Sequence, residues 1–189
     1  MKRFPLAAIF TLPLLGGCLT AVTPENSSWP VEFRPLKTNC EVEPRFGPVR
    51  ILNVSVRAPY SEKYLTVLRA GGTVAFDPAN EYAASPAALV KALAQDAFVY
   101  SGLFSAVVGS ASVVHTDLSA EVAVTRLALD CRGGERRAVA AVTVRLVKDG
   151  KIVAFTKGEG GALATDGDYG MAFSEAVSSA FTEALGKIR

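Results

Sequence analysis

Three runs of alternating apolar and polar residues in the second half of the chain constrain the fold more than any other feature. Alternation with a period of two places the apolar side chains on one face of a β-strand. The runs at 138–147 and 152–157 are joined through Asp149-Gly150, a dipeptide typical of tight hairpin turns. A third run, 118–131, changes phase near Thr125-Arg126, which predicts a β-bulge there. The sequence therefore predicts an antiparallel meander.

Two amphipathic helices flank this meander in the sequence. Ser85 and Pro86 form a helix start, because a serine side chain can accept from a free amide and proline has none to lose. The first helix is expected to run from this start to about Tyr100, and the second to cover 170–187. The stripe expected to be buried on the first helix contains Leu89, Val90, Leu93, Ala94, Ala97 and Tyr100, and that on the second contains Phe173, Val177, Ala180, Phe181, Ala184 and Ile188.

Shorter strand-like segments precede the first helix. The run at 49–56 is rich in β-branched residues, and 64–69 and 73–76 flank Gly71-Gly72, which predicts two strands around a glycine turn. Asp77-Pro78 is expected to end the second of these strands. The predicted fold class is α+β, with a mostly antiparallel β-sheet and two amphipathic helices packed on one face.

The first eighteen residues read as an export signal. Lys2 and Arg3 precede an apolar run at 4–15, which is shorter than the roughly 20 residues of a membrane-spanning helix. It ends in Leu15-Gly16-Gly17-Cys18, the pattern of a bacterial lipobox, in which the cysteine sulfur receives a diacylglyceryl group. The alternative is an ordinary signal peptide with an incidental Cys18. Two or three acyl chains hold a protein firmly on a membrane surface.

These features divide the chain into three parts. Residues 1–17 are expected to be a lipoprotein signal peptide, 18–48 the lipidated cysteine and a tether rich in Pro, Asn, Ser and Glu, and 49–189 a single α+β domain. Leu19 follows the cysteine in place of the Asp that favours inner-membrane retention, so the expected location is the periplasmic face of the outer membrane. The 20 basic and 18 acidic residues leave no dense basic face, so nucleic acid is not an expected partner.

The cysteine count suggests one disulfide. With Cys18 lipidated, Cys40 and Cys131 remain as an even pair in an oxidising compartment. A bridge between them would lower the entropy of the unfolded chain by about 4 to 5 kcal/mol at room temperature. The alternative is two free, buried thiols.

Motifs of catalysis are mostly missing from the sequence. His115 is the single histidine, so any Ser-His-Asp or Cys-His site must use it, yet it lies in a polar turn before a strand. The glycine-rich run 158–161 lacks the lysine and the immediate helix of a phosphate-binding loop. Asp166 and Asp168 could pair at a cation, but an N-cap fits Asp168 without a metal. The expectation is no enzyme, no cofactor and no metal, with a lipid-anchored hydrolase as an alternative.

Two surface regions are candidates for partner binding. Arg132, Arg136 and Arg137 cluster in one turn, where they are either solvated or in contact with a partner or a lipid head group. The loop from Tyr82 to Pro86 is the second region.

Several segments, taken in order, resemble the ABC-type transport auxiliary lipoproteins, a family that includes the Pqi-system lipoproteins. They are the lipobox, Tyr64-Leu65-Thr66-Val67-Leu68-Arg69, the approach from Phe76-Asp77 to Ser85-Pro86, and Ser101-Gly102-Leu103-Phe104-Ser105-Ala106-Val107. The likeness covers about residues 49–188, although Tyr82 stands where many members have Trp. The resemblance implies a non-enzymatic outer-membrane lipoprotein that serves an MCE-type ABC system moving phospholipid or other hydrophobic cargo between the membranes. The implied partners are an MCE-domain protein and the ABC permease and ATPase, and homo-oligomers are possible. The alternative is an envelope assembly or structural lipoprotein without a transport role.

Overall fold

The predicted meander is the centre of the structure. The computed structural model describes residues 27–29, 43–165 and 169–188. Strands β6 (Leu118–Asp130), β7 (Arg137–Lys148) and β8 (Lys151–Leu163) pair antiparallel in sequence order. Both turn residues between β7 and β8 have positive φ, 51° at Asp149 and 71° at Gly150, as a type I′ turn requires. The register of β6 shifts between Val124 and Arg126, which confirms the predicted bulge.

β8 is longer than the sequence indicated. It runs six residues beyond Lys157, where the alternating pattern in the sequence ends, and includes Gly158–Gly161. The predicted end of the strand at Lys157 was therefore wrong. Glycine is normally unfavourable inside a strand, and it is found there where another backbone approaches closely.

The other strands lie on the side of β6 away from β7, where only two of them pair with β6 itself. They are β1 (Ser27–Trp29), β2 (Val49–Val56), β3 (Tyr64–Leu68), β4 (Val74–Tyr82) and β5 (Val107–Val108), and a 3-10 turn, Ala70–Gly72, joins β3 to β4. β2 pairs parallel with the first half of β6, and β3 pairs parallel with its last residues. The described strands form one eight-stranded mixed sheet, in which β5 flanks β2 and the β3–β4–β1 group continues the other half.

The sequence placed the end of β4 too early. Asp77-Pro78 was expected to end the strand, but a register shift against β3 after Asp77 lets the chain continue to Tyr82. The last three residues of β4 pair with β1. Part of the predicted tether therefore belongs to the folded domain, since β1 lies within residues 18–48 and Phe46 also bridges to Phe104.

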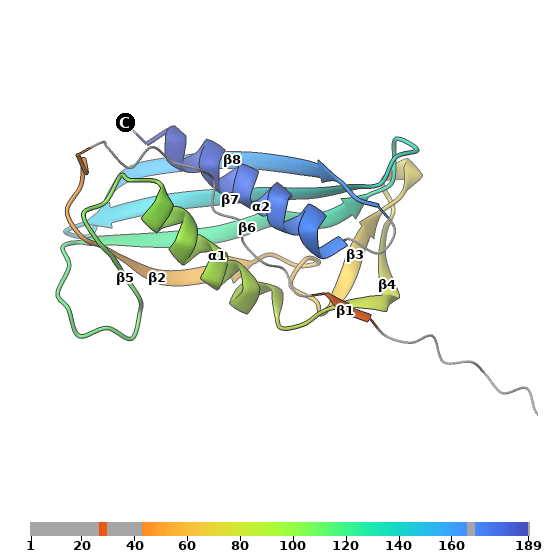
Figure 1. The fold of residues 1–189 in the computed structure, drawn as a ribbon, viewed down its shortest axis with the longest axis horizontal. Coiled ribbons are helices and arrows are strands. Elements are labelled where there is room, and N and C mark those ends of the chain that lie inside the picture. Colours follow the sequence, from red (N-terminus) through yellow and green to blue (C-terminus); the bar gives the residue numbers. More distant parts are fainter. Residues whose placement is uncertain (1–26, 30–42, 166–168, 189) are drawn as a thin grey trace, which may run out of the picture.

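Two helices cover one face of the sheet, which confirms the α+β prediction (Figure 1). α1 (Pro86–Tyr100) begins as expected, with the Ser85 hydroxyl oxygen accepting from the Ala88 amide at 3.3 Å. α2 spans Tyr169–Gly186. Among the described residues, no helix is long and apolar enough to cross a membrane.

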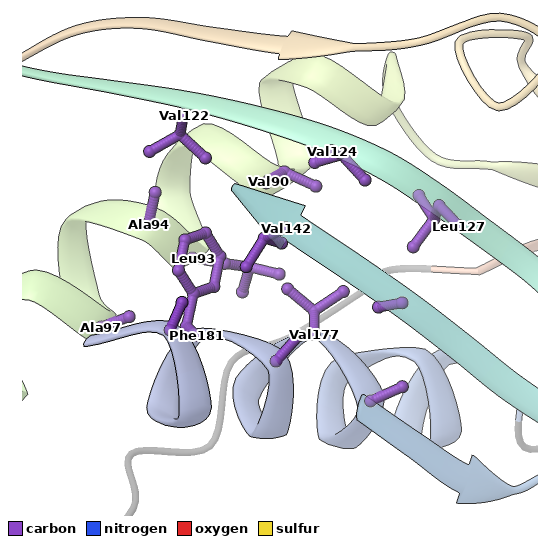
Figure 2. Packing of buried hydrophobic residues seen from close by; sticks show 14 of the residues in the cluster. Val90, Leu93, Ala94, Ala97, Val122, Val124, Leu127, Val142, Val177 and Phe181 are labelled. Carbon is purple, nitrogen blue, oxygen red and sulfur yellow. The ribbon is translucent and has the colours of Figure 1, made fainter. Parts of the chain in front are cut away.

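The buried faces of the helices meet the inner face of the sheet in one core. Figure 2 shows Leu93 of α1 and Phe181 of α2 beside Val142 of β7. The expected stripe of α2 is buried throughout, but that of α1 is rotated, since Phe98 is fully buried and Tyr100 is 39% exposed. Phe98 instead stacks on Phe104, with ring centroids 5.3 Å apart.

Gly158 and Gly160 let α2 lie directly on β8. A Cβ at Gly158 would stand 1.9 Å from the Ala180 carbonyl oxygen, and one at Gly160 would stand 2.0 Å from the Ala176 carbonyl oxygen. Both distances are below any contact that carbon and oxygen can make. The glycines in β8 and the alanines of α2 therefore form a seam in which backbone meets backbone.

Substitution in this seam should destabilise the domain strongly. Gly160→Ala must push α2 away from β8, and overpacking of this kind typically costs about 1–3 kcal/mol or more. Gly161→Ala is the matched control, because its Cβ would meet only ordinary contacts, at 3.6 Å from the Ala138 carbonyl oxygen. Urea unfolding of the three proteins compares these effects. Equal stability of the two variants would contradict the close approach.

Candidate interaction surface

The face of the sheet away from the helices carries an aromatic side chain between two cations. Phe155 of β8 pairs in register with Arg145 of β7 and is 52% exposed. The Arg145 guanidinium carbon lies 6.0 Å from the ring centroid, and the Lys157 ammonium lies 5.8 Å from it. Arg145 also forms an ion pair with Glu121 of β6 at 2.9 Å. Cations over an aromatic ring are attracted to its electron-rich face, so this group has a defined arrangement in spite of its exposure.

A shallow hollow of about 220 Å³ adjoins this group. Its walls come from three neighbouring strands, β2, β6 and β7, together with the Phe155 ring, and most of them are polar. The lining residues are Asn53, Ser55, Glu121, Val122, Ala123, Thr143, Arg145 and Phe155.

The free edge of β8 is partly covered by α2. The Glu183 carboxylate accepts from the Glu159 amide at 2.7 Å, and Lys187 donates to the Lys157 carbonyl at 2.8 Å. Glu183 and Lys187 also pair with each other, and this hydrogen bond lowers the pKa of Glu183. Unpaired backbone groups on an edge strand invite pairing with another chain. The Glu183 and Lys187 side chains therefore satisfy two of these backbone groups, the Glu159 amide and the Lys157 carbonyl.

Two exposed apolar residues follow the turn between β7 and β8. The register shifts between β7 and β8 next to the turn, so Ile152 and Val153 are 59% and 52% exposed although they follow each other in sequence. Val153 also lines a second hollow, of about 340 Å³, with Phe46, Pro48 and Leu118. This surface was not predicted from the sequence. Two adjacent apolar residues, Ile152 and Val153, directly after a tight turn could have indicated it, because strict alternation would bury one of the two.

The predicted arginine cluster is engaged by carboxylates of its own turn and by the first residue of α2. Arg132 contacts the Asp130 carboxylate through two of its nitrogens, at 2.9 and 2.5 Å. Arg136 donates to the Tyr169 hydroxyl at 3.0 Å, and Arg137 lies 3.9 Å from Glu135. The hydrogen bond from Arg132 holds the pKa of Asp130 at about 2. All three arginines are exposed, but they are not three free charges.

The two residues that bound the second predicted region, Tyr82 and Pro86, are buried, whereas residues 83–85 between them are exposed. Tyr82 is 4% exposed and meets the edge of the Phe173 ring at 5.8 Å, and Pro86 lies in the buried first turn of α1. Burial raises the pKa of the Tyr82 hydroxyl, which has no hydrogen-bond partner in the described part of the chain. Neither side chain is offered to a partner, and we do not carry them forward as contact residues.

The cysteine predictions fall mainly outside the described residues. Cys18 and Cys40 lie in the undescribed ranges, and Cys131 is half-buried without a sulfur partner among the described residues. Val49 pairs with Leu118 at the start of β6, whereas Cys131 follows its far end, about 40 Å away for 13 residues. The six residues from Cys40 to Phe46 reach at most about 20 Å. A disulfide needs Cα atoms within about 7 Å. Because Cys40 lies outside the described residues, the pairing stays a prediction.

The remaining polar candidates do not assemble into a larger group. His115 lies in the loop before β6, with its Nε2 atom 3.3 Å from an Asp117 oxygen, and its side chain is 93% exposed. Asp166 and Asp168 lie outside the described residues. Within 27–29, 43–165 and 169–188, no three His, Cys, Asp or Glu side chains are grouped as metal ligands.

Comparison with known proteins gives a fold likeness. No protein-family model and no curated protein matches the chain. The structure of protein XCC0632 from Xanthomonas campestris, of the DUF330 family, is similar with a TM-score of 0.64 at 18% identity, over 84% of this chain and 91% of that one. An uncharacterized protein matches with a TM-score of 0.59 at 10% identity, over 87% of this chain and 96% of that one. The PelC dodecamer from Paraburkholderia phytofirmans reaches a TM-score of only 0.48 at 13% identity, over 86% and 96%, and carries no argument below.

These findings correct the family and function expected from the sequence. The one family named among these neighbours is DUF330, that of XCC0632, and neither this structure nor the uncharacterized protein supports an MCE-type transport role. We therefore withdraw the assignment to the ABC-type transport auxiliary lipoproteins, together with the MCE, permease and ATPase partners. The resemblance rested on a helix that ends at Ser101-Gly102 and on alternating strands. In the structure these segments are α1 and the strands of the sheet, which pack together in the core. At these identities the likeness shows the fold alone.

The unpartnered hydroxyl of Tyr82 predicts an unusual mutational result. Tyr82→Phe should leave the free energy of unfolding unchanged or raise it by up to about 1 kcal/mol, because an unsatisfied buried hydroxyl is removed. Tyr82→Ala should lower it by about 3–5 kcal/mol, since the ring fills the core beside Phe173. Thermal and urea unfolding measure both. A marked loss of stability in Tyr82→Phe would mean that the hydroxyl has a partner.

The Asp130–Arg132 pair predicts an acid-dependent contribution to stability. The pKa of Asp130 is about 2 in the folded protein and close to its ordinary value of 3.8 in the unfolded chain, so the folded state favours the charged form. The contribution is present above pH 4 and disappears as the pH falls towards 2. The stability difference between the natural protein and Asp130→Asn should therefore shrink over this window. NMR titration of the Asp130 carboxyl carbon gives the pKa directly, and a midpoint near 4 would contradict the bond.

Proposed function

We propose that this chain is a lipid-anchored envelope lipoprotein that acts in assembly or structure as a docking module rather than as an enzyme. The observation that carries the proposal is the lipobox Leu15-Gly16-Gly17-Cys18, followed by a domain whose exposed sheet face bears an ordered group of aromatic and charged side chains. The anchor would hold the domain on the periplasmic face of the outer membrane.

The proposed role draws on the different character of the two sheet faces. One face is sealed by α1 and α2, and the other presents Phe155, Arg145, Lys157 and Glu121 around a polar hollow. Such a face suits reversible contact, because a central aromatic supplies buried area while the surrounding charges select the partner. Self-association of the domain remains a prediction, which light scattering of the detergent-solubilised protein measures.

The anchor is tested by the chemistry of residue 18. In envelope membranes of a bacterial host, the natural chain should incorporate labelled palmitate, and its N-terminal peptide should begin at Cys18 with the mass of the acylated residue. Cys18→Ser should lose both signals. Cys131→Ser is the matched control, since it removes a cysteine of the described domain and should retain them.

Partner capture tests the docking role. Crosslinking of the lipidated protein in membranes, followed by mass spectrometry, should recover envelope assembly factors, and Phe155→Ser together with Arg145→Ser should reduce their yield several-fold. Val74→Ser, at an exposed position of β4 in the other half of the sheet, is the control. A measurable turnover abolished by His115→Ala would contradict the non-enzymatic role, and undiminished capture by the Phe155 and Arg145 variant would contradict the assigned surface.

A further inference from the structure

Two side chains of α2 bind the free edge of β8 in the way that a neighbouring strand would bind it. The Glu183 carboxylate accepts from the Glu159 amide, and the Lys187 ammonium donates to the Lys157 carbonyl. In a parallel pair of strands, one residue accepts from the amide of residue i+1 on its neighbour and donates to the carbonyl of residue i−1. An antiparallel neighbour would instead bond both groups of one residue. With Gly158 as residue i, the two side chains therefore imitate a single residue of a parallel strand.

The two side chains can leave this edge without burying a charge. The Lys187 and Glu183 side chains are 51% and 44% exposed, so both can turn further into solvent. A surface ion pair of this kind contributes little to stability. An incoming strand would supply a carbonyl for the Glu159 amide and an amide for the Lys157 carbonyl, so neither group on β8 would lose its hydrogen bond.

A second folded copy of this chain does not fit the edge. Neighbouring strands lie about 4.8 Å apart, whereas packed helices need about 8–10 Å between their axes. α2 lies directly on β8, because a Cβ at Gly158 or Gly160 would meet the backbone of the helix. If two copies paired through β8, their α2 helices would overlap. The edge therefore suits an extended segment that has no helix packed on it.

The side chains of β8 define the sequence of such a segment, because paired residues project on the same face of a sheet. Residues opposite Gly158 and Gly160 would lie against α2 and must be small. Residues opposite Lys157 and Glu159 would lie on the outer face, where both side chains are exposed and their register partners on β7 carry no charge. In a parallel strand, an acidic residue followed two positions later by a basic residue would be complementary to them.

We propose that the free edge of β8 at residues 157–159 binds an extended segment of a partner protein, which adds as a parallel strand in place of the Glu183 and Lys187 side chains. Its small residues face α2, and its acidic and basic residues lie beside Lys157 and Glu159. In strand addition of this kind, backbone hydrogen bonds provide affinity and alternate side chains provide specificity. The inference rests on the proposed docking function and names the element that holds the partner.

A pair of synthetic peptides tests the site on the protein as isolated from membranes in detergent. The probe is acetyl-Thr-Val-Ser-Glu-Ala-Lys-Ser-Val-amide, and the matched control peptide has its Glu and Lys exchanged. NMR titration follows the backbone amide of Glu159 and gives both dissociation constants. We expect the probe to bind at least fivefold more tightly than the control peptide. An antiparallel strand would reverse this preference, because it would place the exchanged charges beside Lys157 and Glu159. Methylation of the central alanine nitrogen, which removes the amide that replaces Lys187, should weaken the probe at least tenfold.

Removal of the competing side chains supplies the second measurement. Glu183→Ala with Lys187→Ala should tighten binding of the probe at least threefold, because the edge is then unoccupied. Glu175→Ala, which removes a carboxylate of the same helix and leaves both bonds to β8 in place, is the control and should not change the affinity. Circular dichroism verifies that each variant folds.

The outcomes separate this site from the docking function. Absence of saturable binding to the natural protein and to the double variant, equal affinity for the two peptides, or preference for the exchanged peptide overturns the proposal. Selective binding of the probe without any partner recovered from membranes would support the edge site and contradict the docking function. Partners recovered through the sheet face together with no probe binding would overturn the edge site and leave the docking function in place.

Discussion

The close contact between α2 and β8 is the constraint on which the rest of the structure depends. Gly158 and Gly160 leave no side chain between the strand and the Ala176 and Ala180 backbone. The helix therefore lies low on the sheet, where Phe173, Val177 and Phe181 reach the valines of β6 and β7. A larger residue at either glycine would lift the helix and open the core beneath it.

This packing gives the two sheet faces different properties. On the inner face, short side chains in β8 and α2 exclude water, and the larger apolar residues of α1 and β6 fill the remaining space (Figure 2). On the outer face, Phe155 remains exposed between Arg145 and Lys157, and Glu121 fixes the arginine. The same helix protects the edge of β8 through Glu183 and Lys187. Core packing and the available contact surface are thus set by one helix position.

Local sequence signals predicted the local elements well because their causes are local. Asp149-Gly150 adopts the positive φ angles of a tight turn, and Ser85 with Pro86 starts α1, since both effects need only neighbouring residues. The errors arose where distant chain segments meet. The glycines at 158–161 did not look like strand residues in the sequence, because the close approach of α2 that requires Gly158 and Gly160 is a tertiary contact. Tyr82 was expected at the surface, but it packs against Phe173 of α2.

The sequence by itself determined the α+β class, the hairpin, the bulge in β6, and the expectation of a lipid anchor at Cys18. Period-two alternation, turn dipeptides and a lipobox express short-range chemistry, which is readable without a fold. Only the tertiary structure decided that β2 and β3 pair parallel with one edge of β6, that Arg132 and Arg136 are engaged by Asp130 and Tyr169, and that Phe155 lies at the centre of the exposed surface. These outcomes depend on which faces are covered, and coverage is set by contacts between residues far apart in the chain.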